Sequence, residues 1–273
     1  MRNLKRLARV LYFSAGYMLG VVLLLILLLP FEVMAADNKL LWLVNPNNPL
    51  EPAYRPEFLI KVDGYLIRPE AGEAFLKMLA DMKADGITNM HLQSAYRPYA
   101  YQSVLFDEKV EKLCEIGYEP NEANVIAARS VAIPGGSEHQ IGLATDVSVD
   151  GKLSVDFGTT EAGIWLRNNC DRYGYILRYP ADKTSITKIV YEPWHLRYVG
   201  IPHAAFMNER NLCLEEYIDL LKEAKILLYW IDEESYYKLS FSYELPENAE
   251  NYSSLGYDPS CGYVVTELKK FQR

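Results

Sequence analysis

The chain has 273 residues, of which 50% are hydrophobic and 23% are charged, and its formal net charge at pH 7 is −8. This composition provides the apolar side chains of a folded core, and the length suits one medium-sized domain with additions or two small domains. The acidic balance excludes the basic surface on which nucleic-acid binding depends, so we expect no nucleic-acid partner.

Residues 1–35 have the pattern of a membrane anchor or an export signal. A basic segment, residues 1–9, precedes an almost uninterrupted apolar stretch over residues 10–30. About twenty apolar residues can span a bilayer, and a basic flank stays in the cytoplasm. Small residues ending at Ala35 also suit cleavage by signal peptidase, although the apolar run exceeds the usual signal core of about 7–15 residues. We expect a single-pass anchor, or alternatively a secreted chain, with the remaining residues outside the membrane.

The following segment, 31–57, is rich in Pro and Asn and is expected to be an extended extracytoplasmic linker. Apolar residues at three- and four-residue spacing predict a helix from about Ile67 to Gly86. A helix with Val104, Leu105 and Val110 on its buried face is expected after Pro98. Further elements are expected in chain order: strands over 89–95, 144–149, 175–178 and 194–199, and helices over 121–131 and 160–172. Because strands and helices are interleaved without regular alternation, we predict an α+β fold.

Residues 212–273 are expected to form an appended α/β subdomain in which no chemistry is visible. An amphipathic pattern predicts a helix over 212–224. Two runs rich in aromatic and β-branched residues, 226–231 and 236–243, are separated by a charged break and predict a β-hairpin. A last strand is expected over 262–268.

The four cysteines are far apart in the sequence and form no CxxC pair: Cys114, Cys170, Cys213 and Cys261. A structural zinc site is therefore not expected from them. Outside the cytosol they could form two disulfides, or they could remain free thiols that behave as small hydrophobic residues. The sequence leaves both alternatives open.

Two of the four histidines lie in contexts that predict a metal site. Gly142 allows the backbone to bend between His139 and Asp146, so an imidazole and a carboxylate could converge. With His195 they make a three-ligand set for zinc, which leaves the fourth position open for water. Zinc lowers the pKa of that water to about 7 and polarises a carbonyl oxygen. No motif includes the other two histidines, which we expect to be structural: His91 and His203.

Three more polar residues could act on a substrate at such a site. Glu192 lies three residues before His195, and it could accept a proton from the metal-bound water and pass it to a leaving amine. Pro193 argues against a helix here, so both residues are expected on an irregular approach to a strand. Arg97, with Gln102 about one turn further on, could bind a carboxylate or a developing oxyanion. Taken alone, these positions are better explained by a core histidine, a surface ion pair of Arg97 and a solvated Gln102.

In combination, these segments closely resemble the VanY-type D-alanyl-D-alanine carboxypeptidases. This family comprises zinc peptidases of the bacterial cell wall, related to the VanX dipeptidases and the LdcB L,D-carboxypeptidases. Three motifs in the family's order carry the resemblance: Ser94-Ala95-Tyr96-Arg97 followed by Gln102, the pattern S-x-H-x-x-G-x-A-x-D from Ser137 to Asp146, and Glu192-Pro193-Trp194-His195. The resemblance extends over about residues 58–211 and includes neither the N-terminal arm nor the tail.

The resemblance implies a zinc carboxypeptidase domain over residues 58–211, with the hedgehog/DD-peptidase fold of a small antiparallel sheet flanked by helices. One zinc ion would be held by three ligands: His139, Asp146 and His195. Glu192 would be the general base and then the acid, and Arg97 would contact the substrate near the scissile bond. Two further residues would support Arg97 in binding the substrate: Gln102 and Ser137.

The implied function is a membrane-attached zinc D,D-carboxypeptidase that removes the terminal D-alanine from peptidoglycan stem peptides outside the membrane, without an organic cofactor. The motifs fit equally an L,D-carboxypeptidase acting on tetrapeptide stems, or a D,D-dipeptidase. The expected export segment argues against the dipeptidase, whose free dipeptide substrate is cytoplasmic. A metal-stabilised module that binds wall peptides without cleaving them is a further alternative, against which the presence of Glu192 argues.

Overall fold

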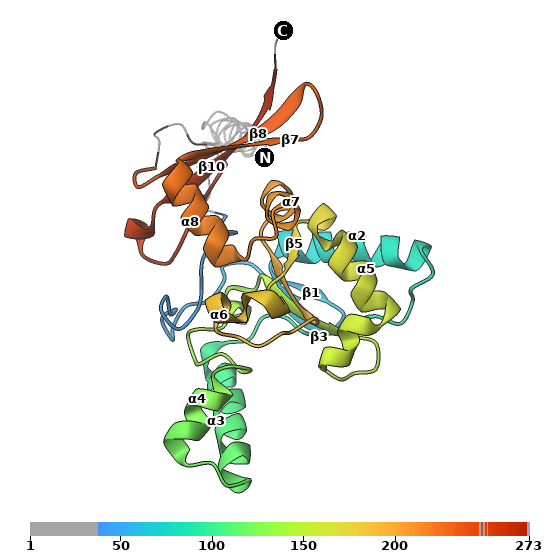
Figure 1. Cartoon of the computed structure of the whole chain (residues 1–273), viewed down its shortest axis with the longest axis vertical. Coiled ribbons are helices and arrows are strands. Elements are labelled where there is room, and N and C mark those ends of the chain that lie inside the picture. Colours follow the sequence, from blue (N-terminus) through green and yellow to red (C-terminus); the bar gives the residue numbers. More distant parts are fainter. Residues whose placement is uncertain (1–37, 246, 248, 250, 272–273) are drawn as a thin grey trace, which may run out of the picture. The chain divides into compact units, whose positions relative to one another are not determined.

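The structure is a computed structural model that describes residues 38–271 except 246, 248 and 250 (Figure 1). The expected anchor or signal over residues 10–30 lies outside these described residues. Within the described part, none of the helices has the length and apolar character needed to cross a membrane.

The central sheet has four antiparallel strands in the order β3-β4-β6-β5: β3 (His91–Ser94), β4 (Ala144–Ser148), β6 (His195–Tyr198) and β5 (Tyr175–Leu177). The predicted α+β fold with a small antiparallel sheet is confirmed. Asp146 on β4 pairs in register with Ser94 on β3 and with His195 on β6. Strand pairing therefore places residues of all three sequence motifs side by side across the sheet.

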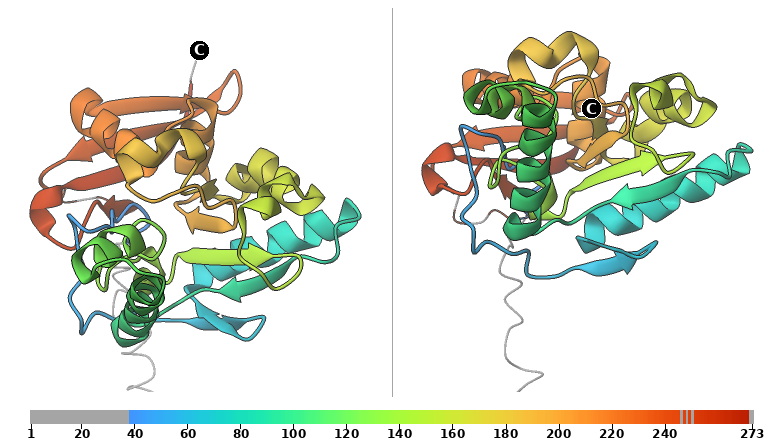
Figure 2. Two further views of the ribbon diagram at one scale, coloured as in Figure 1. Left: turned by 60° about the horizontal axis from the view of Figure 1, so that its bottom comes forward. Right: turned by 90° about the horizontal axis from the view of Figure 1, so that it is seen from below.

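One face of this sheet is covered by α2 (Pro69–Ala84), as Figure 2 shows. The expected apolar stripe of this helix is buried, and Phe75 and Met78 belong to the same core cluster as Leu92 and Leu196 of the sheet. Neighbouring elements pack near it: α5 (Glu161–Asn169), the 3-10 turn η3 (Cys170–Tyr173) and a hairpin of β1 (Ile60–Val62) and β2 (Tyr65–Ile67). The three-residue strands of this hairpin were too short to be expected from sequence patterns.

Two helices form a hairpin with a small core of its own, remote from the C-terminal strands (Figure 1): α3 (Tyr99–Glu115) and α4 (Pro120–Ala127). The prediction that Val104 lies on the buried face of the first helix is wrong, because its side chain is 50% exposed. The buried stripe instead contains Gln102, Phe106 and Leu113. Helix α3 packs against α4 along that stripe, and the sequence pattern did not assign a buried position to the polar Gln102.

Residues 38–50, expected to belong to an extended linker, are instead folded onto the domain. Leu41 and Val44 are almost completely buried. The guanidinium of Arg197 on β6 donates hydrogen bonds to the carbonyl oxygens of Leu40 at 2.9 Å and Trp42 at 3.0 Å. The segment is rich in Pro and Asn overall, but it contains a short apolar run, residues 40–44, that packs into the core.

The C-terminal segment forms a second antiparallel sheet in the order β7-β8-β10-β9: β7 (Ile226–Trp230), β8 (Ser235–Ser242), β10 (Tyr263–Lys270) and β9 (Tyr252–Ser254). The expected hairpin of its first two strands is confirmed, whereas the short β9 was not expected. Two helices precede this sheet: α7 (Ile201–Glu209) and α8 (Leu214–Ala224). Tyr217 and Leu221 of α8 share a buried cluster with Ile176 of β5 and with Val199, which follows β6, so the tail packs on the rest of the domain.

Short turns also occur between these elements: η1 (Glu138–Ile141), η2 (Val155–Thr159), η4 (Ala181–Lys183), the single-turn α6 (Thr184–Thr187) and η5 (Pro259–Cys261).

All four cysteines are free thiols. Burial raises the pKa values of Cys170 and Cys213 to about 12, which keeps both thiols protonated at neutral pH.

His203 connects α7 to the tail. Its buried ring contacts the hydroxyl of Tyr217 on α8 at 2.7 Å and the hydroxyl of Thr266 on β10 at 3.2 Å. Burial lowers the pKa of His203 from 6.5 to about 4. The ring is therefore neutral in the folded protein at pH 7 and has a structural environment, as expected from the sequence.

The depressed pKa predicts how stability depends on pH. The unfolded chain takes up a proton at His203 below about pH 6.5, whereas the folded chain does so only near pH 4, so this contribution to stability is lost as pH falls between these values. The loss amounts to about 3 kcal/mol at pH 4. Urea unfolding in chelator at pH 7 and pH 4 should show the stability advantage of wild type over His203→Asn shrinking by this amount. An advantage that is independent of pH would contradict the prediction.

Candidate metal centre

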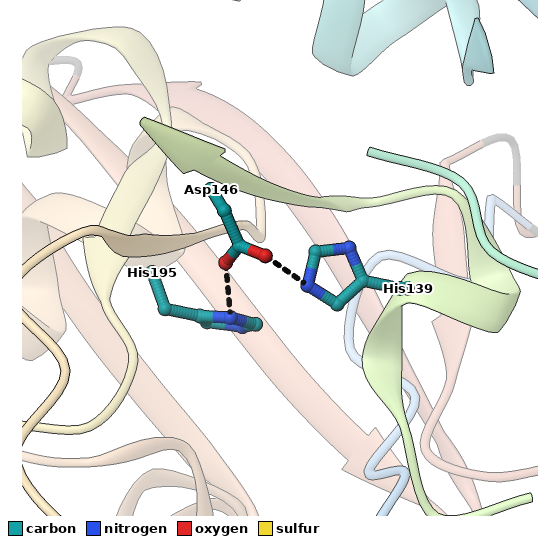
Figure 3. Close-up of side chains that lie close together, drawn as sticks. All are labelled: His139, Asp146 and His195. Carbon is teal, nitrogen blue, oxygen red and sulfur yellow. Dashed lines mark hydrogen bonds and ion pairs between the residues drawn. The ribbon is translucent and has the colours of Figure 1, made fainter. Parts of the chain in front are cut away.

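Three predicted ligands meet at one end of the central sheet (Figure 3). His139 lies in η1, Asp146 on β4 and His195 at the start of β6, and one ligand atom from each lies within 4.8 Å of the others. The Asp146 carboxylate lies between the imidazoles, with Oδ2 3.1 Å from His139 Nε2 and Oδ1 3.0 Å from His195 Nδ1. All three side chains are buried.

The backbone around η1 explains how His139 reaches this position. The turn ends at Gly142, whose φ of 73° lies in the left-handed region that glycine adopts readily. The chain then enters β4, which carries Asp146. The backbone N–H of Arg97 donates to the carbonyl oxygen of His139 at 3.1 Å, so the turn is also held against the end of β3.

The protonation state of His139 shows that the site fits a cation. Its Nδ1 lies 2.5 Å from the carbonyl oxygen of Ala95, which can only accept, so Nδ1 carries the proton. Burial, together with the charge of Arg97, lowers the pKa of His139 to about 4, so the ring is neutral at pH 7. Its Nε2 lone pair then faces an oxygen of the Asp146 carboxylate and accepts no hydrogen bond from residues 38–271 as far as they are described. A cation bound by both atoms would remove this repulsion.

His195 has the opposite electrostatic environment. Despite its burial, the hydrogen bond to Asp146 and the nearby Glu138 carboxylate raise its pKa to about 9. Without a metal the ring is therefore protonated at neutral pH, and its Nδ1 proton faces Asp146 at 3.0 Å. Metal binding at this nitrogen requires loss of that proton. Two imidazoles and one carboxylate are a donor set that suits zinc.

Glu192 lies beside the three ligands, in the turn that leads into β6. One of its carboxylate oxygens is 3.9 Å from His195 Nδ1, and its side chain is buried. Burial, together with the charge of Asp146, raises the pKa of Glu192 to about 8. A carboxyl group with a pKa near neutrality can both accept and return a proton, which suits a general base that later acts as an acid.

Arg97 is held in a fixed orientation next to the ligands. Its Nε donates to Oε1 of Gln102 at 3.0 Å, and its Nη1 lies 3.2 Å from the hydroxyl of Ser94 and 3.3 Å from Oδ2 of Asp146. Gln102 is completely buried and donates to the carbonyl oxygen of Ala132 at 2.7 Å. Gln102 therefore orients Arg97 rather than facing the cavity.

An open cavity of about 420 Å³ lies over the site. Six of the seven residues predicted from the sequence line it: Arg97, Ser137, His139, Asp146, Glu192 and His195. The seventh, Gln102, lies behind Arg97. The far wall is formed by α3 and includes Leu105 and Lys109.

Sequence reasoning missed four buried residues around the ligands: Glu138, Arg178, Tyr179 and Arg197. The ring of Tyr179 lies over the ring of His195, with centroids 4.8 Å apart. Although burial opposes ionisation of Glu138, the charges of Arg178 and Arg197 hold its pKa well below the usual range. Glu138 is adjacent to His139, but the sequence contains no signal that pairs it with either arginine.

The comparisons with known proteins agree with this site. The family model for VanY, described as D-alanyl-D-alanine carboxypeptidase, matches residues 64–201. A D-alanyl-D-alanine carboxypeptidase of Enterococcus faecium is 40% identical over 168 residues, which are 61% of this chain and 48% of the relative. The chain thus spans about half the length of that relative.

Two solved structures are also similar to this chain. One is a mutant of the vancomycin-resistance D,D-pentapeptidase VanY from a VanB-type cassette in complex with Zn(II), with 40% identity, a TM-score of 0.59 and coverage of 66% of this chain and 98% of that one. The other is the L,D-carboxypeptidase LdcB, with 38% identity, a TM-score of 0.58 and coverage of 66% and 86%. The matched segment contains all three motifs and every candidate ligand, and the chain belongs to the VanY family of D-alanyl-D-alanine carboxypeptidases.

Proposed function

We propose that this protein is a zinc-dependent D,D-carboxypeptidase that hydrolyses the terminal D-alanine of peptidoglycan stem peptides outside the membrane. The contact between the Nε2 lone pair of His139 and the Asp146 carboxylate carries the proposal, because it calls for a bound cation. Membership of the VanY family supports the reaction, and the Zn(II) complex of its relative supports the metal.

The residues around the ligands supply the proton transfers of the hydrolysis. When bound, zinc supplies a Lewis acid that makes water nucleophilic at neutral pH. Glu192 accepts a proton from the attacking water as the new C–O bond forms, and returns it to the amine of the departing D-alanine as the C–N bond breaks. Arg97 faces the same cavity, where its guanidinium would hold either the substrate's terminal carboxylate or the developing oxyanion.

The location of the enzyme remains part of the proposal. The apolar stretch over residues 10–30, flanked by basic residues, supports a single-pass anchor with the catalytic domain outside, or secretion after cleavage near Ala35. A peptidoglycan substrate is itself outside the membrane, which agrees with either alternative. Cell fractionation with external protease distinguishes them: an anchored chain stays with the membrane and is digested from outside.

A second candidate is an L,D-carboxypeptidase that acts on tetrapeptide stems. The similarity to LdcB favours it specifically, since its identity and TM-score are close to those for VanY. The two activities differ in the residue on the acyl side of the scissile bond, so matched penta- and tetrapeptide stems separate them. Release of D-alanine from the tetrapeptide alone would replace the first proposal with the second.

The first prediction from the proposed function concerns the metal. We expect the purified protein to contain about one zinc ion per chain. It should release D-alanine from a pentapeptide stem, lose this activity in chelator and regain it with added zinc. Asp146→Asn should weaken zinc binding by a factor of about 10 or more because it removes the charge between the two imidazoles. A protein without zinc that is fully active in chelator would contradict the proposed site.

The second prediction concerns the proton transfer. Glu192→Gln keeps the shape of the side chain but cannot accept the proton, so kcat should fall by a factor of about 100 or more. Zinc content and peptide binding should stay unchanged, as measured by elemental analysis and calorimetry. Glu111→Gln on the exposed face of α3 is a matched control that should keep full activity. Normal turnover by Glu192→Gln would remove Glu192 from the mechanism.

The third prediction assigns the role of Arg97. Arg97→Lys keeps the charge but loses the planar fork that Gln102 and Ser94 hold in place. If Arg97 binds the developing oxyanion, kcat should fall by a factor of about 100 with little change in KM. If it binds the terminal carboxylate, the loss should occur mainly in KM. Unchanged kcat and KM would show that Arg97 contacts neither group.

A further inference from the structure

A buried chain of charged side chains connects the metal site with the C-terminal segment. Glu215, in the first turn of α8, accepts two hydrogen bonds from Arg178, at 2.9 and 2.7 Å. Arg178 also donates from Nε to Oε1 of Glu138 at 2.8 Å. Arg197 on β6 approaches the same oxygen of Glu138 at 2.8 Å. The chain therefore begins on the tail and ends next to the ligand His139.

The cost of burying these charges indicates a role beyond stability. The side chains of Arg178, Arg197 and Glu138 are each at most 1% exposed. The two arginines balance the two glutamates, but buried ion pairs of this kind at best offset the cost of removing the charges from water. Such a network also fixes the positions of its side chains. The orientation of Glu138, the last residue of this network, shows which side chain the network holds in place.

Glu138 points an unpaired oxygen at a metal ligand. Both arginines contact Oε1, whereas Oε2 is buried and has no hydrogen-bond partner among the described residues. Nε2 of His195 is also buried, makes no hydrogen bond within the part of the chain that the structure describes, and lies 3.8 Å from this Oε2. The other ring nitrogen of His195 faces Asp146 at 3.0 Å. The imidazole thus has one nitrogen directed at the candidate ligand Asp146 and the other directed at the Glu138 carboxylate.

The chemistry of a metal-bound histidine explains this arrangement. When Nδ1 of His195 is a ligand, the ring proton resides on Nε2 and needs an acceptor. In metalloproteins that acceptor is very often a carboxylate, which fixes the ring orientation and makes the ligand more basic. Oε2 of Glu138 is the carboxylate oxygen near Nε2 and would accept a hydrogen bond from this N–H when a metal is bound.

We propose that Glu138 is a positioning residue for the ligand His195, and that α8 holds it in place through the Glu215–Arg178 pair. The inference rests on the proposed zinc site. It gives the tail a role that its strands alone do not indicate, because Glu215 lies beyond the segment 64–201 that the family model matches. Removing the Glu215 charge should therefore change the affinity and the ligand geometry of the metal site.

The test compares three variants of the full protein: Glu138→Gln, Glu215→Gln and Glu216→Gln. Glu216 is a matched control, because it follows Glu215 on α8 but pairs with Lys183 instead of Arg178. Zinc affinity is measured by competition with a chromogenic chelator. The visible absorption spectrum of the cobalt(II)-substituted protein reports the ligand geometry, and circular dichroism reports the fold.

We expect Glu138→Gln to weaken zinc binding by a factor of about 10 to 100 and to change the cobalt spectrum. Glu215→Gln should change both properties in the same direction but to a smaller extent, and Glu216→Gln should change neither. Because Glu138 is completely enclosed, its variant has the greater risk of misfolding, and the partly exposed Glu215 then carries the test alone.

Folded Glu215→Gln protein with wild-type zinc affinity and cobalt spectrum would overturn the inference and leave the network with a structural role only. The same holds if Glu216→Gln weakens zinc binding as much as Glu215→Gln does. Failure of the proposed function has a different signature, since wild type itself would then bind no zinc.

Discussion

The geometry of the site depends on the placement of one carboxylate, that of Asp146, between two imidazoles. Antiparallel pairing sets this placement, because β4 lies between β3 and β6 and brings Asp146 into register with both Ser94 and His195. The turn at Gly142 then returns His139 to the same point. The result is a neutral imidazole whose lone pair faces a buried anion, an arrangement that a bound cation would stabilise.

The charged groups around these ligands divide into two sets with different environments. Toward the cavity, Glu192 has a pKa raised to about 8 and Arg97 is held by Gln102, so this side can exchange protons and contact a substrate. Away from the cavity, Glu138 is held ionised between two buried arginines. The same residue type is thus suited to proton transfer on one side and to positioning on the other, because burial without a cation raises a carboxyl pKa and adjacent cations lower it.

The C-terminal segment is integrated with this site rather than attached beside it. Its helix α8 shares a buried cluster with β5 and α7, and its first turn binds Arg178. Residues 38–50 contribute from the other end of the chain, since their carbonyl oxygens hold Arg197. The segment that matches the VanY family contains the candidate ligands. The segments before and after it contact the buried arginines behind these ligands.

The sequence was enough to predict the candidate site, because ligand types and their spacing are local: His139, Asp146, Glu192 and His195 are recognisable within short motifs. Regular helices such as α2 and α8 were also predictable, since an apolar stripe is a local pattern. The packing of the whole chain was needed to show that residues 38–50 belong to the core and that Gln102 is buried. It also paired Glu138 with Arg178 and Arg178 with Glu215, because ion pairs between residues some forty positions apart depend on chain packing and leave no periodic signal in the sequence.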